Sequence, residues 1–303
     1  PWLTIAGFLA LATQSAFFNP PKYGMIREVT GPGQLSRANG VISLATNISI
    51  IAGMAVSGQL LEQGRYLVAL LLFGITILGV VSAWSIPKLP AMNPGVNIRW
   101  NPFSEVVRDL LAMRSTPVWI VSWIWSGFFF AAILLVSAIP DMQHELGVSM
   151  SDSSLLLGAA GLGIGIGCAI AGWCSGAAIR NTFVCPGGGA LVCVYLLMAI
   201  LPPSWWLVFV LLMLLGIASG FYLVPLLAMM QRLAPPEERG RWLAASNWLC
   251  YVMMSLAGLF YALTASYLGV KGIFLACSGV MLFIVVVLLA IPHALKFDEA
   301  EYA

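Results

Sequence analysis

Long apolar runs separated by short polar joints dominate the pattern of this chain. Each run of about 20 apolar residues is long enough to cross the hydrocarbon core of a bilayer as a helix. Nine such spans are predicted, at roughly 1–18, 41–61, 66–86, 118–139, 153–174, 184–201, 204–230, 243–268 and 272–292. The pattern therefore predicts an all-α membrane protein.

Composition supports the same class. Hydrophobic residues make up 60% of the chain and charged residues only 9%, whereas soluble domains carry about 25% charged residues. We expect membrane lipids around the chain and no nucleic-acid partner. The six cysteines lie in apolar segments without a CxxC pair, so we expect no metal site and no cofactor.

The longest polar joint, 87–117, divides the chain into parts. Within it, apolar residues such as Phe103, Val107 and Leu111 recur at helical spacing with charged residues between them, which predicts an amphipathic helix at the membrane surface. We therefore expect three spans in residues 1–86, a linker at 87–117 and a six-helix half at 118–303.

Basic residues are concentrated in every second joint, and this distribution predicts the orientation of the chain in the membrane. Of 14 lysines and arginines, twelve fall in alternate joints or the C-terminal tail, and the other two are Arg65 and Lys271. Because cytoplasmic joints carry the excess of positive charge, we expect Pro1 outside and the C-terminus in the cytoplasm.

Two segments about 204 residues apart resemble each other. The stretch FFNPPKYGMIREVTGPGQLSRANG aligns with GFYLVPLLAMMQRLAPPEERGRWLAASN, so that Pro21 matches Pro225 and Arg37 matches Arg241. A parallel repeat indicates two halves related by an axis along the membrane normal, as in the major facilitator fold. Since each half of that fold has six helices, we expect helices four to twelve here, with the first three missing.

These segments also carry a resemblance to a known family. NPPKYGMIREVTGPGQLSRANGVI resembles the signature of bacterial lysophospholipid transporters, and PPEERGR is similar to relatives fused to phospholipid acyltransferases. The resemblance implies a secondary transporter of the bacterial inner membrane rather than an enzyme. It also implies lysophospholipid, mainly lysophosphatidylethanolamine, as substrate and a cytoplasmic acyltransferase as possible partner. Alternatives are an efflux carrier for drugs or metabolites, or the membrane half of a bifunctional acyltransferase.

Polar residues within or near the spans are candidates for the substrate path or its gate. Lysine suits a phosphate as a point charge, although a lysine near a span end also extends toward headgroups without any further role. For the other candidates, hydrogen bonding between helices is the alternative. The candidate set is Asn19, Lys22, Tyr23, Asn47, Tyr222, Gln231 and Asn247.

Charged residues in the two similar segments form a second candidate group. They are expected to tie the helix ends together on the cytoplasmic side, with the ties breaking during alternating access. Isolated exposed ion pairs contribute only about 0–1 kcal/mol, so only a network could bias that equilibrium. The group is Arg27, Glu28, Arg37, Arg232, Glu237, Arg239 and Arg241.

The glycine-rich stretch GAAGLGIGIG, residues 158–167, has the spacing of a dinucleotide-binding loop. Such a loop follows a strand and opens a helix, whereas these glycines lie inside an apolar run. Close packing between membrane helices is the predicted role.

Overall fold

The computed structural model describes residues 2–90, 101–146, 150–176 and 179–290, and helices account for the regular structure of these ranges. The C-terminal tail, and with it the predicted location of the C-terminus, lies outside the described residues. In chain order the helices are α1 (Trp2–Gly24), α2 (Ile26–Thr30), η1 (Pro32–Gln34), α3 (Leu35–Gln63), α4 (Arg65–Ala83), α5 (Pro102–Met113), α6 (Pro117–Leu146), α7 (Met150–Ser175), η2 (Asn181–Phe183), α8 (Val184–Ile200), α9 (Trp205–Leu233) and α10 (Arg239–Ala290).

Helices occupy the ranges that the apolar runs predict. The last two predicted spans are the two limbs of α10, which are separated at Gly269 by a left-handed backbone conformation (φ 62°) that glycine adopts without strain. In the described part of the chain, six helices are long and apolar enough to cross a membrane, with α10 counted once; α1 and α3 are not among them. The number nine stays a prediction.

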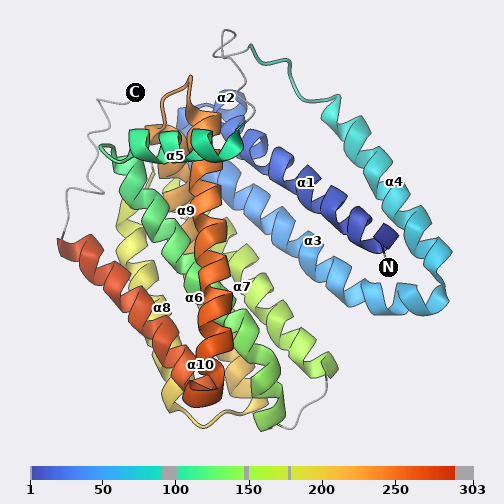
Figure 1. The fold of residues 1–303 in the computed structure, drawn as a ribbon, viewed down its shortest axis with the longest axis vertical. Helices are drawn as coiled ribbons and strands as arrows, with labels where there is room; N and C mark the ends of the chain where they lie inside the picture. The colour runs from blue at the N-terminus through green and yellow to red at the C-terminus, as the bar shows by residue number, and fades with distance from the viewer. Residues whose placement is uncertain (1, 91–100, 147–149, 177–178, 291–303) are drawn as a thin grey trace.

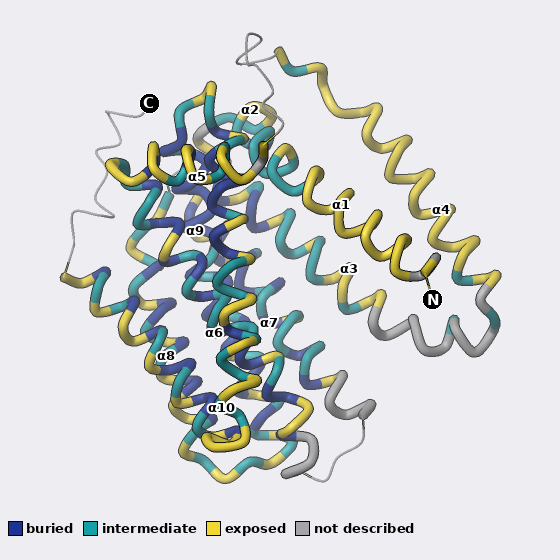
Figure 2. The backbone as a smooth tube through the Cα atoms, viewed as in Figure 1, coloured by how far each residue is buried: buried dark blue, intermediate teal, exposed yellow. Residues whose placement is uncertain are grey.

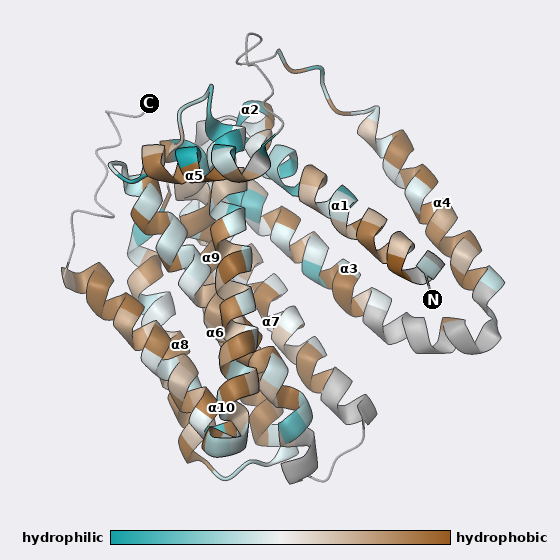
Figure 3. Ribbon diagram, in the orientation of Figure 1, coloured by the Kyte–Doolittle hydropathy of each residue, from teal (hydrophilic) through white to brown (hydrophobic). Residues whose placement is uncertain are grey.

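The helix ends gather at two levels of the molecule. At one level lie α2, α5 and the turn between α9 and α10, and Figure 3 shows hydrophilic residues concentrated there. We call this level the basic end, because it holds Arg27, Arg108, Arg239 and Arg241. The α3–α4 turn and the α8–α9 turn lie toward the other level (Figure 1).

The two parts of the chain differ in how much they bury. Helices α6 to α10 form a bundle whose core includes fully buried residues such as Tyr195 and Tyr222. In the apolar segment of α9, 56% of residues are buried, against 0% in that of α4. Figure 2 shows α1 and α4 exposed along most of their described length, whereas α3 is partly covered where it meets the bundle.

The glycines of α7 confirm the packing interpretation of the glycine-rich stretch. A Cβ added to Gly163 would lie 2.3 Å from the carbonyl oxygen of Met213 on α9, and one added to Gly220 would lie 2.1 Å from the carbonyl carbon of Gly167. Contacts this short leave no room for any side chain. The two helices therefore meet backbone to backbone, as small residues allow in membranes.

Candidate functional site

A reciprocal amide pair joins the two halves of the chain at the basic end. Asn39 on α3 donates from Nδ2 to Oε1 of Gln231 on α9 (2.7 Å), and Gln231 donates back from Nε2 to Oδ1 of Asn39 (3.1 Å). Both side chains are fully buried. Because a buried amide without a partner is costly, this pair favours the state in which α3 and α9 are in contact.

Gln231 also provides a hydrogen-bond donor for a backbone carbonyl at the end of α1. The last carbonyls of a helix have no partner within it, and Gln231 Nε2 donates to the backbone oxygen of Tyr23 (3.0 Å). Tyr23 precedes Gly24, the last residue of α1, and follows two prolines in that helix. One side chain of α9 thus contacts both α1 and α3.

Charged residues form a second set of ties next to the amide pair. Arg27 on α2 donates from Nη1 to the backbone oxygen of Arg232 (2.9 Å), and Arg239 Nη1 lies 3.5 Å from Glu28 Oε1. Burial, and then the charges of Arg239 and Arg232, lower the pKa of Arg27 from its usual value. Glu28 pairs with Arg239 rather than with Arg27. Through these contacts the segments that resemble each other in sequence meet in space.

Arg241 extends this set to the linker helix. Its guanidinium binds the carboxylate of Asp109 on α5 through two hydrogen bonds, one of them Nε to Oδ2 at 3.2 Å. Glu105 of α5 and Glu238 each lie 3.9 Å from the same guanidinium. The beginning of α10 is therefore held by α5 as well as by α2.

A cavity of about 310 Å³ lies between the two halves, and Tyr23 belongs to its wall. Polar side chains are few, and one of them, Asn47, already donates Nδ2 to the carbonyl oxygen of Ser43 (2.8 Å). Most of the wall is apolar or aromatic. The lining residues come from α1, α3, α6, α7 and α9: Tyr23, Ser43, Thr46, Asn47, Trp125, Phe128, Phe129, Ala132, Ile164, Cys168, Leu223, Val224 and Leu227.

Helices α3 and α7 diverge away from the basic end. A Cβ added to Gly40 would lie 2.5 Å from the carbonyl oxygen of Cys168, so the backbones touch there. Farther along, a Cβ on Gly165 would meet the Leu44 side chain at 3.2 Å, and one on Gly161 would meet the Ile51 side chain at 3.5 Å. The separation of the two helices widens in Figure 1 in the same direction. This arrangement is closed at the basic end.

The structure does not bring all of the predicted path residues together. Lys22 is half-buried, with its ammonium 5.2 Å from the centroid of the Tyr23 ring. Asn19 is half-buried one turn earlier on α1, and Asn247 is half-buried on α10. Tyr222 lies in the bundle core, where its hydroxyl donates to the carbonyl oxygen of Ile124 (3.0 Å). This is a hydrogen bond between helices, the alternative to a role in the substrate path.

The predicted charge group is also divided. Arg27, Glu28 and Arg239 lie in the contacts between the halves. Arg37 and Glu237 are exposed. Within the described residues, Arg241 pairs with Glu238, the residue after Glu237.

Two residues of the basic end were not among the candidates. They are Asn39, which lies in the first segment of the repeat, and Asp109, a charged residue of the linker helix. Asp109 is buried, with 5% exposure, and is bound by Arg241. Their polarity was visible in the sequence, but their partners are 192 and 132 residues away. The local spacing of apolar and polar residues cannot identify such distant partners.

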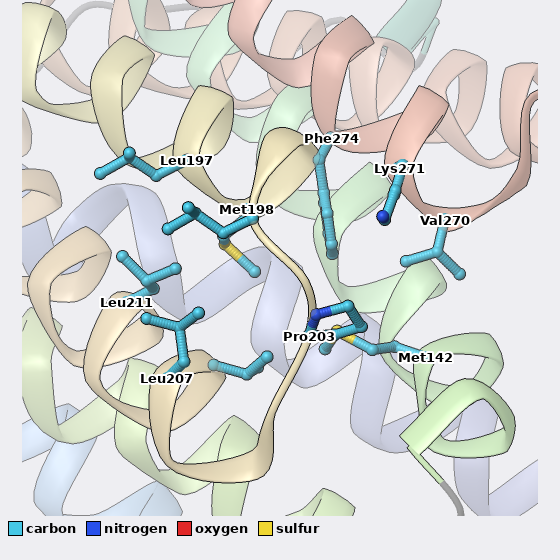
Figure 4. Close-up of a pocket in the computed structure, with 11 residues that line it drawn as sticks. Met142, Leu197, Met198, Pro203, Leu207, Leu211, Val270, Lys271 and Phe274 are labelled. Atoms are coloured by element: carbon cyan, nitrogen blue, oxygen red, sulfur yellow. The ribbon is translucent and has the colours of Figure 1, made fainter.

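A second cavity lies within the C-terminal half, toward the end opposite the basic end (Figure 4). Its volume is about 10 Å³, which is room for about one water molecule. Met142, Met198 and Phe274 line it, together with the charged residue Lys271. It is too small for a lipid, and its lining includes no residue of α1 or α3.

Relatives of known name are similar to most of this chain. Lysophospholipid transporter LplT of Escherichia coli O1:K1 / APEC is 31% identical over 245 residues, which are 78% of this chain and 58% of the relative. LplT of Klebsiella pneumoniae (strain 342) is 28% identical over 243 residues, again 78% and 58%. LplT of Photorhabdus laumondii subsp. laumondii is 29% identical over 237 residues, 74% and 57%. The chain thus spans less than three-fifths of the length of these relatives.

No solved structure matches the chain. The family model described as Major Facilitator Superfamily matches residues 1–176 and, in a second match, residues 128–300. Together the two matches extend over nearly the whole sequence, including both segments of the repeat. The chain therefore belongs to the Major Facilitator Superfamily.

Proposed function

We propose that the chain is part of a secondary transporter that moves lysophospholipid, chiefly lysophosphatidylethanolamine, across the bacterial inner membrane. The similarity to lysophospholipid transporters supports the substrate class. The superfamily and the apolar helices support a multi-pass location in the membrane. The excess of basic residues at one end supports a cytoplasmic assignment for that end.

The cavity between the halves is the observation that carries this proposal. It is largely apolar, holds only a few hydroxyl and amide groups, and is bounded by both halves of the chain. An amphiphile with one small polar head and one acyl chain matches such a wall better than a strongly polar solute does, because buried polar groups need partners. In the described residues the cavity wall includes no charged side chain.

The contacts around this cavity support alternating access. The amide pair and the Glu28–Arg239 pair join the halves at the basic end, and α3 diverges from α7 away from that end. We assign this arrangement to the state closed toward the cytoplasm. Opening toward the cytoplasm separates these contacts while the six-helix half keeps its own core, as in rocking of one half against the other.

Lys22, Tyr23 and Asn47 are the residues we assign to headgroup passage. Tyr23 lies at the boundary between the cavity and the amide pair, and the Lys22 ammonium lies over its ring. A lysine at this place offers a positive charge to a phosphate leaving the cavity. Asn47 offers its amide within the cavity once its bond to Ser43 is exchanged.

Uptake of labelled lysophosphatidylethanolamine into spheroplasts tests the proposal with the full-length protein. Lys22→Ala is expected to lower uptake by about tenfold or more, since loss of one charged hydrogen bond corresponds to about 1.5–3 kcal/mol. Lys22→Arg, which keeps the charge, is expected to retain part of it. Uptake near wild type in both variants removes Lys22 from the mechanism.

The same assay separates the main alternative. Export of a drug panel without lysophospholipid uptake identifies an efflux carrier and overturns the proposed substrate. A cytoplasmic acyltransferase that reacylates the imported lipid is part of the proposal, and its test is whether uptake in the cell is followed by conversion to diacyl phospholipid.

A further inference from the structure

The linker helix α5 lies across the basic end at a steep angle to the helices of the bundle (Figure 1). Asn101 caps its first turn by accepting a hydrogen bond from the backbone NH of Ser104 (3.3 Å), and Pro102 occupies its first helical position, as is common at helix starts. Three residues after α5 ends, Pro117 begins α6, whose apolar segment starts at the same residue. The helix is therefore located at the level where the spans end.

One face of α5 carries large apolar side chains without cover. Phe103 is 70% exposed, Val107 51% and Leu111 63%. Their spacing of four residues places them in one stripe along the helix. We call these three residues the apolar stripe.

The other face of α5 is buried against the bundle. Met113 is fully buried and Asp109 is 5% exposed. Asp109 accepts two hydrogen bonds from Arg241, and Arg241 lies two residues after Arg239, which reaches Glu28 across the halves. The position of α5 is thus connected to the ties that close the basic end.

We propose that the apolar stripe inserts into the headgroup boundary of an anionic leaflet at the basic end and that this insertion, through Asp109 and Arg241, favours the closed basic end. Arg114 follows the stripe in the sequence and is exposed, which complements an anionic surface, whereas the exposed Arg108 is hydrogen-bonded to Glu105. A helix lying in the plane of the interface with an apolar face and basic flanks is the form that binds such surfaces. The inference rests on the proposed function only for naming this leaflet cytoplasmic.

Nitroxide labels on purified full-length protein test the insertion without any transport measurement. In a background with the native cysteines replaced, a label at position 107 is compared with one at Ala112, which is exposed but lies about 140° around the helix from Val107. Relaxation by oxygen and by a water-soluble nickel complex then reports the surroundings. Nanodiscs contain phosphatidylcholine alone or phosphatidylcholine with phosphatidylglycerol.

The proposal expects the label at 107 to be accessible to oxygen and protected from nickel, more so with phosphatidylglycerol, while the label at 112 stays accessible to nickel. Accessibility of 107 to nickel in both lipids means that the stripe faces water and overturns the proposal. Protection of 107 from both reagents means that protein covers the stripe, whether a second copy or another protein, and also overturns it.

The coupling to the gate has its own readout. Labels at the exposed positions Val29 and Gly240, on either side of the Glu28–Arg239 pair, report the distance across the basic end. Phosphatidylglycerol is expected to increase the closed population of the wild type several-fold and to have no such effect when Phe103, Val107 and Leu111 are all replaced by serine. Asp109→Asn is expected to keep the insertion and lose the lipid effect.

Arg114→Gln is a graded variant that is expected to lose only part of the lipid effect, because one arginine supplies only part of the attraction to an anionic surface. Because the stripe is exposed, the serine variant is expected to keep the wild-type melting temperature in detergent, so failure to fold is recognised separately. An unchanged lipid effect in the serine variant contradicts the coupling. Since neither readout uses lysophospholipid, both stand if the proposed substrate is wrong.

Discussion

Helix α7 packs mainly against α9 and α3, and these two contacts differ in kind. Against α9, in the same half, glycine backbones touch at two levels, with added Cβ atoms at 2.3 Å for Gly163 and 2.1 Å for Gly220. Against α3, in the other half, the backbones touch at Gly40, where the corresponding distance is 2.5 Å. Toward Gly161 that contact loosens to ordinary side-chain contact at 3.5 Å.

The difference indicates which interface moves. A contact made by backbone atoms over two turns offers many close contacts and no alternative arrangement. A contact that is tight only at one end separates by losing a few contacts there. We therefore expect α7 and α9 to move as one body and α3 to hinge away from them at the basic end.

Replacing Gly220 by valine is expected to have the largest effect. Its added atoms would meet the backbone of Gly167 and Cys168 at 2.1 and 2.2 Å, and overpacking costs about 1–3 kcal/mol even where side chains can shift. Loss of monodisperse protein in detergent, or a clearly lowered melting temperature, is the expected result. Gly258→Val is the control, since a Cβ there meets nothing within 4 Å; equal behaviour of the two variants contradicts a rigid α7–α9 contact.

Gly40→Ala is expected to have an intermediate effect that concerns conformation rather than folding. The added methyl group would lie against the Cys168 carbonyl only when the basic end is closed, so the closed population should fall by about tenfold, corresponding to about 1.4 kcal/mol. The distance between labels at Val29 and Gly240 measures it. Gly53→Ala on the same helix has free space and should leave the distribution unchanged; a lowered melting temperature without opening would show that the α3 contact is as permanent as the α9 contact.

The variant that removes both amides of the pair is expected to have the smallest effect on the closed population, and it tests whether the pair belongs to the contact that opens. Hydrogen bonds between membrane helices average about 0.6 kcal/mol, whereas an amide left buried without its partner costs about 1–3 kcal/mol. Asn39→Leu and Gln231→Leu alone should therefore each open the basic end more than the double variant does. Purely additive shifts in a double-mutant cycle on the same label pair would mean that the two amides do not act together.

Much of this fold was predictable because membrane helices can be recognised in a sequence by the length and composition of their apolar runs. The joint at 87–117, the helix within it and the break between the last two spans all follow from local pattern. The packing role of the glycines of α7 was also predictable, because small residues inside an apolar run allow membrane helices to approach each other closely. The count of spans depends on marginal helices such as α1, whose two prolines and polar end weaken its signal.

The site was less accessible from sequence, because it is made of pairs between distant segments. The repeat indicated that the Arg27 and Arg232 segments are equivalent, and in the structure they are in contact, with 2.9 Å between Arg27 Nη1 and the backbone oxygen of Arg232. Which amide faces which is decided by side-chain direction in three dimensions. Tyr222 and Asn39 are both polar residues in apolar surroundings, yet one packs within a half and the other between halves.

The size of the cavity between the halves has a consequence for how the molecule responds to its surroundings. Its volume of about 310 Å³ is many times the roughly 10–15 Å³ that one water molecule requires, so the cavity has room for water. If one conformation holds that water and the other expels it, solutes excluded from the protein surface favour the drier conformation. Osmotic strength then shifts the conformation of the protein although no solute binds to it.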